Sequence, residues 1–186
     1  DNRLACWLSL EGGHIIENSV EILEFFSSLG IRSMTLTHSK NTDWADSSGE
    51  PPRWDGLNAL GKQIVTRMES LHMIIDVSHV SDKTIEDVLD VTSAPFMASH
   101  SNARALCDIP RNLPDDLIGE IAERNGYIGV NFFPVFLKKS IFDQVSKNVE
   151  KYEHHHQEIL QRTSEDPDFV SEAESDLFKK SVEGSA

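Results

Sequence analysis

The sequence contains few cysteines, few basic residues and no long apolar run, and each shortage argues against a class of protein. Cys6 and Cys107 are too few for a disulfide framework in 186 residues, and they do not suggest a thiolate metal site. The longest apolar stretches, such as residues 73–77, fall far short of the roughly 20 residues that span a bilayer. Only 17 lysines and arginines stand against 31 acidic residues. Phosphate binding needs clustered basic residues, so nucleic acid is a poor candidate partner.

A recognisable targeting segment is also missing from the sequence. Residues 1–13 do not show the basic start, apolar run and small-residue cleavage site of a secretory signal, in that order. A cytoplasmic location is therefore the default expectation. An export signal or an anchor outside this chain stays open.

The sequence does show a regular alternation of short apolar runs and longer helical segments. Runs that favour strands occupy residues 4–11, 33–38, 73–79, 95–100 and 127–133. Segments of helical periodicity occupy residues 17–30, 57–71, 81–92 and 114–126. Parallel strands joined by crossover helices produce such an alternation. The prediction is an α/β fold with about five parallel strands.

The character of the sequence changes near residue 136. Residues 137–161 predict a polar, weakly amphipathic helix, and the remainder is acidic with few large apolar residues. We predict no sixth strand. The expected organisation is one unit over residues 1–136 and a helical, acidic insertion or extension over residues 137–186.

Ionisable side chains follow four of the predicted strands: Glu11, His38, His79 and His100. The carboxyl ends of parallel strands share one edge of a sheet or barrel, so these residues are expected to converge. Glu11, His79 and His100 would form a ligand set for a divalent metal ion. Any one of these histidines alone is better explained as a polar residue that closes a strand. The occurrence of such residues at the same end of several strands favours a metal or catalytic site.

Five short blocks in the first 136 residues resemble successive motifs of a known family. They are SLEGGH (9–14), LTHSKN (36–41), DVSHVS (76–81), ASHSNARAL (98–106) and PRNLPDD (110–116). In this order they are similar to the membrane (renal) dipeptidases, peptidase family M19, which have an amidohydrolase-like barrel. The resemblance implies that the chain is the central part of a (β/α)8 TIM-type barrel.

The resemblance also implies a zinc-dependent dipeptidase that hydrolyses the peptide bond of a dipeptide through a metal-activated hydroxide. It implies that Glu11 bridges two zinc ions and that His79 and His100 complete the second zinc site. It assigns His38 to the substrate and its tetrahedral intermediate, as the catalytic residue, and Arg111 to the substrate carboxylate. The sequence leaves open whether the protein forms a homodimer.

Two motifs of the family do not occur in these 186 residues: a His-x-Asp pair of the first zinc site and a late D-F-D-G block with a catalytic Asp. A (β/α)8 barrel typically needs about 250 residues. Truncation at both ends is therefore expected. Only one of the two zinc sites would be complete, which puts activity of the chain alone in doubt.

Two other functions remain open from the sequence. One is a different metal-dependent amidohydrolase that acts on a non-peptide amide or ester. The other is an inactive fragment or paralogue that serves as a binding module. Arg111 distinguishes a dipeptidase from the first alternative, because its implied role requires a substrate with a carboxylate. The alternative explanation of Arg111 is a surface residue that faces Asp108, Asp115 and Asp116.

Overall fold

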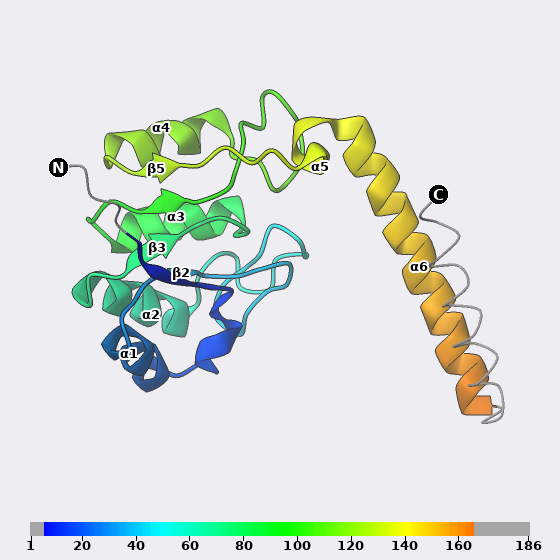
Figure 1. Ribbon diagram of the computed structural model, residues 1–186, viewed down its shortest axis with the longest axis horizontal. Coiled ribbons are helices and arrows are strands. Elements are labelled where there is room, and N and C mark those ends of the chain that lie inside the picture. Colours follow the sequence, from blue (N-terminus) through cyan, green and yellow to red (C-terminus); the bar gives the residue numbers. More distant parts are fainter. Residues whose placement is uncertain (1–5, 166–186) are drawn as a thin grey trace. The chain divides into compact units, whose positions relative to one another are not determined.

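The computed structural model describes residues 6–165, with one parallel sheet at its centre (Figure 1). The strands follow one another across the sheet in chain order, and all neighbours are parallel. Their bounds are β1 Leu8–Glu11, β2 Ile31–Thr35, β3 Ile74–Asp76, β4 Met97–Ala98 and β5 Tyr127–Ile128. The predicted α/β fold of about five parallel strands is confirmed.

Helices connect the strands and lie beside the sheet in the same order as the strands (Figure 1). Their bounds are η1 Gly13–Ile16, α1 Val20–Ser28, α2 Ala59–Ser70, α3 Asp82–Val91 and α4 Asp115–Glu123. Three of them begin at a side chain that accepts a hydrogen bond from the first turn, as helix caps do. These caps are Ser19, Asn58 and Ser81. The crossover helices are thus encoded locally.

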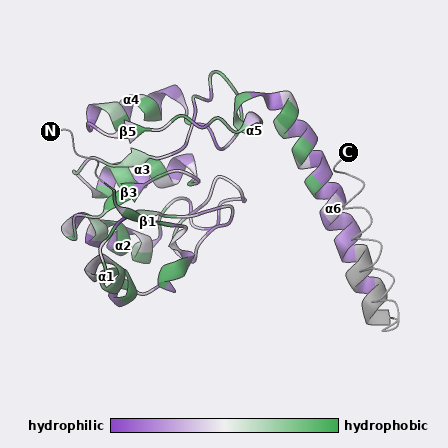
Figure 2. Ribbon diagram, viewed as in Figure 1, coloured by the Kyte–Doolittle hydropathy of each residue, from purple (hydrophilic) through white to green (hydrophobic). Residues whose placement is uncertain are grey.

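The hydrophobic core lies between the sheet and its helices. Met34 and Ile75 contribute from the strands. The helices contribute apolar side chains that are fully buried, namely Leu23, Ile64, Met68, Ile85 and Ile121. Hydrophobic and hydrophilic residues alternate along α4, as expected for a helix with one buried face (Figure 2). Burial of each such side chain contributes about 1.5–3 kcal/mol.

The other face of the sheet carries polar side chains. Ser33 and Thr35 flank Met34 along β2, so they point away from the helices. With Asp76 and Ser99 they line a pocket of about 840 Å³. The same pocket is also lined by Glu11 and His100, at the carboxyl edge of the sheet.

Most strands end earlier than the sequence predicts. β3 ends at Asp76, whereas the apolar run continued to His79. His79 itself cannot belong to the strand, because its φ is 71°, which no extended strand contains. The ionisable residues expected at strand ends therefore lie on the first residues of the loops, except for Glu11, which closes β1.

A buried carboxylate organises the long loop over residues 41–56. Both carboxylate oxygens of Asp46 accept hydrogen bonds from backbone amides of the same loop, at 2.8–3.1 Å. The donors are Arg53, Trp54 and Gly56. The Asp46 carbonyl also accepts from Ser81 at the start of α3. The loop is thereby fixed against the carboxyl edge of the sheet.

The chain divides into two compact units, residues 1–139 and residues 140–186. The first unit ends with a short helix that the sequence did not predict, α5 Pro134–Leu137, which begins at a proline. The second contains most of α6 Lys139–Glu165, which runs longer than the helix predicted over residues 137–161. Hydrophilic residues dominate α6 (Figure 2). The acidic segment that follows lies outside the described residues.

Within residues 6–165, no helix has both the length and the apolar character needed to cross a membrane.

Candidate metal centre

Three of the predicted residues meet at the carboxyl edge of the sheet. Glu11 comes from the end of β1, and His79 and His100 come from the loops after β3 and β4. Glu11 Oε1 lies 3.3 Å from His79 Nε2 and 3.4 Å from His100 Nε2. The two Nε2 atoms lie 2.8 Å apart. The expected convergence of distant residues therefore occurs.

His38 joins this cluster from the loop after β2. Its Nε2 lies 3.9 Å from Glu11 Oε1, and its ring centroid lies 4.4 Å from that of His79. Its side chain is half exposed, whereas that of His79 is 12% exposed. His38 thus lies at the open side of the cluster, where a ligand from solvent can reach it.

The backbone of His79 is held in an unusual conformation by the loops around it. Its φ of 71° is in the left-handed region, which a histidine seldom adopts without support. The His79 carbonyl accepts from the Ser48 amide at 2.8 Å. The hydroxyls of Thr37, Ser47 and Ser48 lie 3.1 Å from the same oxygen. Residues 41–56 thus help to aim the His79 imidazole at Glu11.

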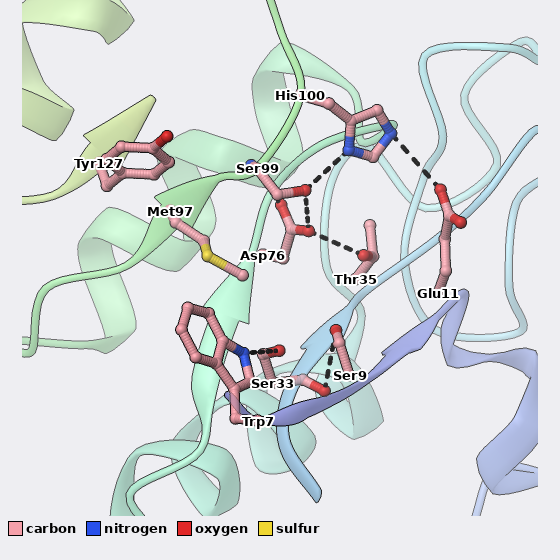
Figure 3. Close-up of a pocket in the computed structure, with 10 residues that line it drawn as sticks. All are labelled: Trp7, Ser9, Glu11, Ser33, Thr35, Asp76, Met97, Ser99, His100 and Tyr127. Carbon is pink, nitrogen blue, oxygen red and sulfur yellow. Dashed lines mark hydrogen bonds and ion pairs between the residues drawn. The ribbon is translucent and has the colours of Figure 1, made fainter. Parts of the chain in front are cut away.

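A chain of polar side chains supports His100 from behind (Figure 3). His100 Nδ1 lies 2.7 Å from Ser99 Oγ, and Ser99 Oγ donates to Asp76 Oδ2 at 2.5 Å. Asp76 is 2% exposed and also accepts from Thr35 Oγ1. The far nitrogen of His100, Nε2, faces Glu11.

Burial and neighbouring positive charge keep both imidazoles neutral. Burial lowers the pKa of His79 to about 3, and Arg111, His100 and His38 add to the shift. Burial also lowers the pKa of His100, followed by the charge of Arg111. A neutral imidazole offers a lone pair, which is the form that binds a metal ion.

Arg111 lies beside the cluster and has few polar partners. Its guanidinium donates to the His100 carbonyl at 3.2 Å, and its Cζ lies 5.1 Å from the centroid of the Phe136 ring. Burial lowers the pKa of Arg111 to about 10. Within residues 6–139, no carboxylate lies within ion-pair distance of Arg111, whose polar partners are Ser101 Oγ and the His100 carbonyl. Arg111 therefore does not pair with Asp108, Asp115 or Asp116.

The donor set of Glu11, His79 and His100 fits a divalent ion. The three ligand atoms lie within 4.8 Å of one another. Ligands about 2.0–2.1 Å from a tetrahedral ion lie roughly 3.3 Å apart, which both carboxylate–imidazole distances match. The two imidazoles are somewhat closer than that and would open slightly around an ion.

From the sequence, a structural role for Asp76 and a role in orienting a ligating histidine both stay open, and Ser99 is not predicted as part of the site. The local signals were an acid three residues before His79 in an otherwise apolar strand, and a serine directly before His100. Phe136, which lies against Arg111, had no signal because the turn of α5 that carries it was not predicted.

A parallel β/α sheet with carboxylate and imidazole groups gathered at the carboxyl ends of its strands is the arrangement of metal-dependent β/α-barrel enzymes. Comparison with known proteins identifies the family within this class of enzymes. A sequence model of the membrane dipeptidases, peptidase family M19, matches residues 1–163. The chain belongs to this family, whose members are metallopeptidases, and membership implies metal dependence.

Individual relatives agree with the family assignment. Dipeptidase 3 of Mus musculus is 36% identical over 157 residues, which are 82% of this chain and 32% of the relative. The crystal structure of the probable dipeptidase PvdM from Pseudomonas aeruginosa superposes with a TM-score of 0.68 at 38% identity, over 70% of this chain and 34% of that one. A metallopeptidase from Rhodobacter sphaeroides, solved with a phosphinate mimic of the dipeptide L-Ala-D-Ala, has a TM-score of 0.65 at 33% identity. That likeness covers 70% of this chain and 38% of the solved one.

The chain spans about a third of the length of the curated relatives that it matches. The solved neighbours are TIM-barrel proteins, so the five strands correspond to part of such a barrel.

Proposed function

We propose that this chain supplies one zinc site and the substrate-binding groups of a dipeptidase. The observation that carries the proposal is the convergence of Glu11, His79 and His100 at one edge of the sheet, with Arg111 beside them. The family is that of the dipeptidases, and one solved neighbour holds a dipeptide mimic, which supports a dipeptide as substrate.

In this proposal Glu11, His79 and His100 hold zinc, because carboxylate oxygens and imidazole nitrogens are its usual ligands in catalytic sites. Glu11 would also hold the second zinc ion that the resemblance to the family implies. When bound, zinc acidifies water near neutral pH and polarises a carbonyl. Neutral His79 and His100 keep their lone pairs available for this role.

His38 acts on the substrate in the same proposal. It lies on the exposed side of the cluster, 3.9 Å from Glu11, and is not part of the ligand set. From there its imidazole stabilises the negative charge that develops on the scissile carbonyl oxygen. Preorganised donors of this kind are often the largest catalytic contribution.

Arg111 binds the free carboxylate of the dipeptide. A guanidinium presents a planar set of donors that matches a carboxylate. Two of its nitrogens donate to the His100 carbonyl and to Ser101 Oγ, and neither of these partners is charged. The positive charge is therefore available to an anionic ligand. A substrate without a carboxylate would leave this buried charge uncompensated.

The test uses the complete open reading frame that encodes this chain. Zinc content is measured by mass spectrometry, and hydrolysis is measured with L-Ala-D-Ala, with L-Ala-L-Ala, and with a lactone and a cyclic amide. We expect zinc-dependent hydrolysis of a dipeptide that is lost in His100→Ala. The control is His72→Asn, at the amino end of β3, where asparagine tolerates the φ of 53°.

Hydrolysis of the lactone or cyclic amide without dipeptide hydrolysis would favour another metal-dependent hydrolase. A protein that binds no zinc and hydrolyses none of the substrates would favour the non-catalytic binding module.

A further inference from the structure

The buried carboxylate of Asp76 ends a chain of hydrogen bonds that begins at His100 (Figure 3). Asp76 Oδ1 accepts from the backbone amides of Ser78 at 2.9 Å and Ser99 at 3.0 Å. Asp76 Oδ2 accepts from Thr35 Oγ1 at 2.9 Å and from Ser99 Oγ at 2.5 Å. All four donors point toward the carboxylate, so it acts as an acceptor only.

The direction of these hydrogen bonds decides where His100 carries its proton. A serine hydroxyl has one hydrogen, and Ser99 donates it to Asp76. Ser99 Oγ is then an acceptor toward its other two partners, His100 Nδ1 at 2.7 Å and Ser78 Oγ at 3.3 Å. This direction puts the proton of neutral His100 on Nδ1. Its Nε2 then accepts from His79 Nε2 at 2.8 Å, and Glu11 Oε1 lies 3.4 Å from the same atom.

We propose that Asp76 and Ser99 are positioning residues that set the tautomer of His100, with its proton on Nδ1 and the lone pair of Nε2 directed into the cluster. Neither residue belongs to the ligand set. The benefit for zinc rests on the proposed function, because only a bound ion makes use of this lone pair. Partners of this kind commonly fix the tautomer and orientation of ligating histidines.

The position of Asp76 explains why this role falls to a buried strand residue. In the register of the sheet Asp76 pairs with Met97 on β4 and with Thr35 on β2. It thus reaches donors from both neighbouring strands. Ser99 follows β4 directly, and its hydroxyl links Asp76 in the interior of the sheet to His100 at the carboxyl edge.

An amide at position 76 would reverse the direction of the chain. In Asp76→Asn the amide oxygen stays with the backbone amides of Ser78 and Ser99, because those hydrogens cannot turn away. The NH₂ group then donates to Ser99 Oγ and to Thr35 Oγ1, whose hydroxyl turns to become an acceptor. The Ser99 hydroxyl turns to donate to His100 Nδ1, which at 2.7 Å is nearer than Ser78 Oγ at 3.3 Å. His100 is left with its proton on Nε2, the form that cannot ligate through that atom.

The test follows the tautomer directly by NMR in the metal-free protein. The complete open reading frame is labelled with [¹⁵N]histidine, and His100 is assigned by its loss in His100→Ala. We expect the Nδ1–H form in the wild-type protein, the Nε2–H form in Asp76→Asn, and a mixture in Ser99→Ala. Ser99→Thr retains the hydroxyl and is expected to restore the Nδ1–H form.

Zinc affinity is the second readout, measured by competition with a chromophoric chelator. Loss of such a partner typically weakens metal affinity about 10- to 100-fold, and we expect this for Asp76→Asn and Ser99→Ala. The matched control is Thr35→Val, which removes one donor to the same Asp76 oxygen without touching Ser99. It is expected to lower the melting temperature while leaving the His100 tautomer and the zinc affinity unchanged.

The outcomes separate this inference from the proposed function. An unchanged His100 tautomer in Asp76→Asn and Ser99→Ala would overturn the inference, even if the wild-type protein binds zinc. A tautomer change in Thr35→Val of the same size would also overturn it, since Asp76 would then have only a general structural role. The expected tautomer changes in a protein that binds no zinc would support the inference and contradict the proposed function.

Discussion

At the scale of single residues, His38 provides the sharpest test of the proposed chemistry. It faces Glu11 and His79 but is outside the ligand set. His38→Ala is therefore expected to leave bound zinc unchanged and to reduce kcat, because the stabilisation it provides appears only in the transition state. Removal of one such group typically reduces kcat about 10²- to 10³-fold. Steady-state kinetics on a dipeptide, with the zinc content of the same sample, measure both quantities.

A rise in KM with an unchanged kcat would contradict this role of His38, since it would indicate equal binding of substrate and transition state. Loss of zinc in the variant would instead make His38 a ligand. Ser39→Ala is a suitable comparison, because Ser39 Oγ lies 3.3 Å from His38 Nδ1 and its loss leaves the imidazole in place.

The gathering of Glu11, His38, His79 and His100 could be predicted from the sequence, because each ends an apolar run that predicts a strand of a parallel sheet. That inference requires only the order of the elements. A supporting role for Asp76 stayed open from the sequence, but its link to His100 through Ser99 could not be predicted, because it depends on the register that places Asp76 opposite Met97. The register of two neighbouring strands cannot be determined from a single sequence.

At the scale of elements, Gly13 determines how closely the loop after β1 approaches β2. A Cβ at this position would lie 2.5 Å from the Leu36 carbonyl oxygen and would overlap the ring of the buried Trp44. Gly13→Ala must therefore displace the loop that follows Glu11. Overpacking of this kind typically costs about 1–3 kcal/mol of stability.

The expected results for Gly13→Ala are a lower free energy of unfolding and weaker zinc binding, measured by urea denaturation and chelator competition. Gly119→Ala in α4 is the control, because a Cβ there meets no atom within 4 Å. In a helix, that change is expected to be neutral or to stabilise by up to about 1 kcal/mol. Equal effects of the two variants would show that the close approach at Gly13 is unimportant.

Asp87 links α3 to the start of α2 and makes the stability of this pair of helices depend on pH. Its carboxylate accepts from Lys83 Nζ at 2.6 Å and from the Leu57 amide at 2.8 Å. Burial acts to raise the pKa of Asp87, but these hydrogen bonds and the charge of Lys83 outweigh it, so the pKa is lowered. A lowered pKa in the folded state stabilises the protein above the unfolded value of about 3.9, and this stabilisation is lost as the pH falls.

Asp87→Asn is expected to reduce the free energy of unfolding at neutral pH by about 1–3 kcal/mol, the usual effect of a lost hydrogen bond to a charged group. The difference from wild type should shrink as the pH falls through the lowered pKa of Asp87. Urea denaturation across this pH range measures it. Glu86→Gln is the control, because Glu86 also pairs with Lys83 but its side chain is 54% exposed. A difference for Asp87→Asn that does not change with pH would contradict the assignment.

The crossover helices α1 to α4 could be predicted because their apolar periodicity and caps are local features. The short helices η1 and α5 could not, since one turn is too brief to show a period. Strand ends were predicted too late because apolar residues such as Val77 continue past the last paired residue. Val77 is buried in the core, although it lies beyond β3.

At the scale of the whole molecule, the sheet has two open edges in the described part of the chain. β1 pairs only with β2, and β5 pairs only with β4. Exposed apolar side chains mark both edges: Leu8 is 63% exposed on β1, and Tyr127 is 64% exposed on β5. An edge of this kind readily pairs with a further strand.

We therefore expect the 186-residue chain in isolation to associate with itself in a concentration-dependent way, which sedimentation velocity measures. Leu8→Lys places a charge on the β1 edge and is expected to weaken the association, since edge lysines oppose strand pairing. Phe25→Lys is the matched control, because Phe25 is 58% exposed on α1 and the change in charge is the same. Equal effects of the two substitutions would attribute the association to general hydrophobicity or charge. A chain that sediments as a monomer at all concentrations would show that the edges do not pair.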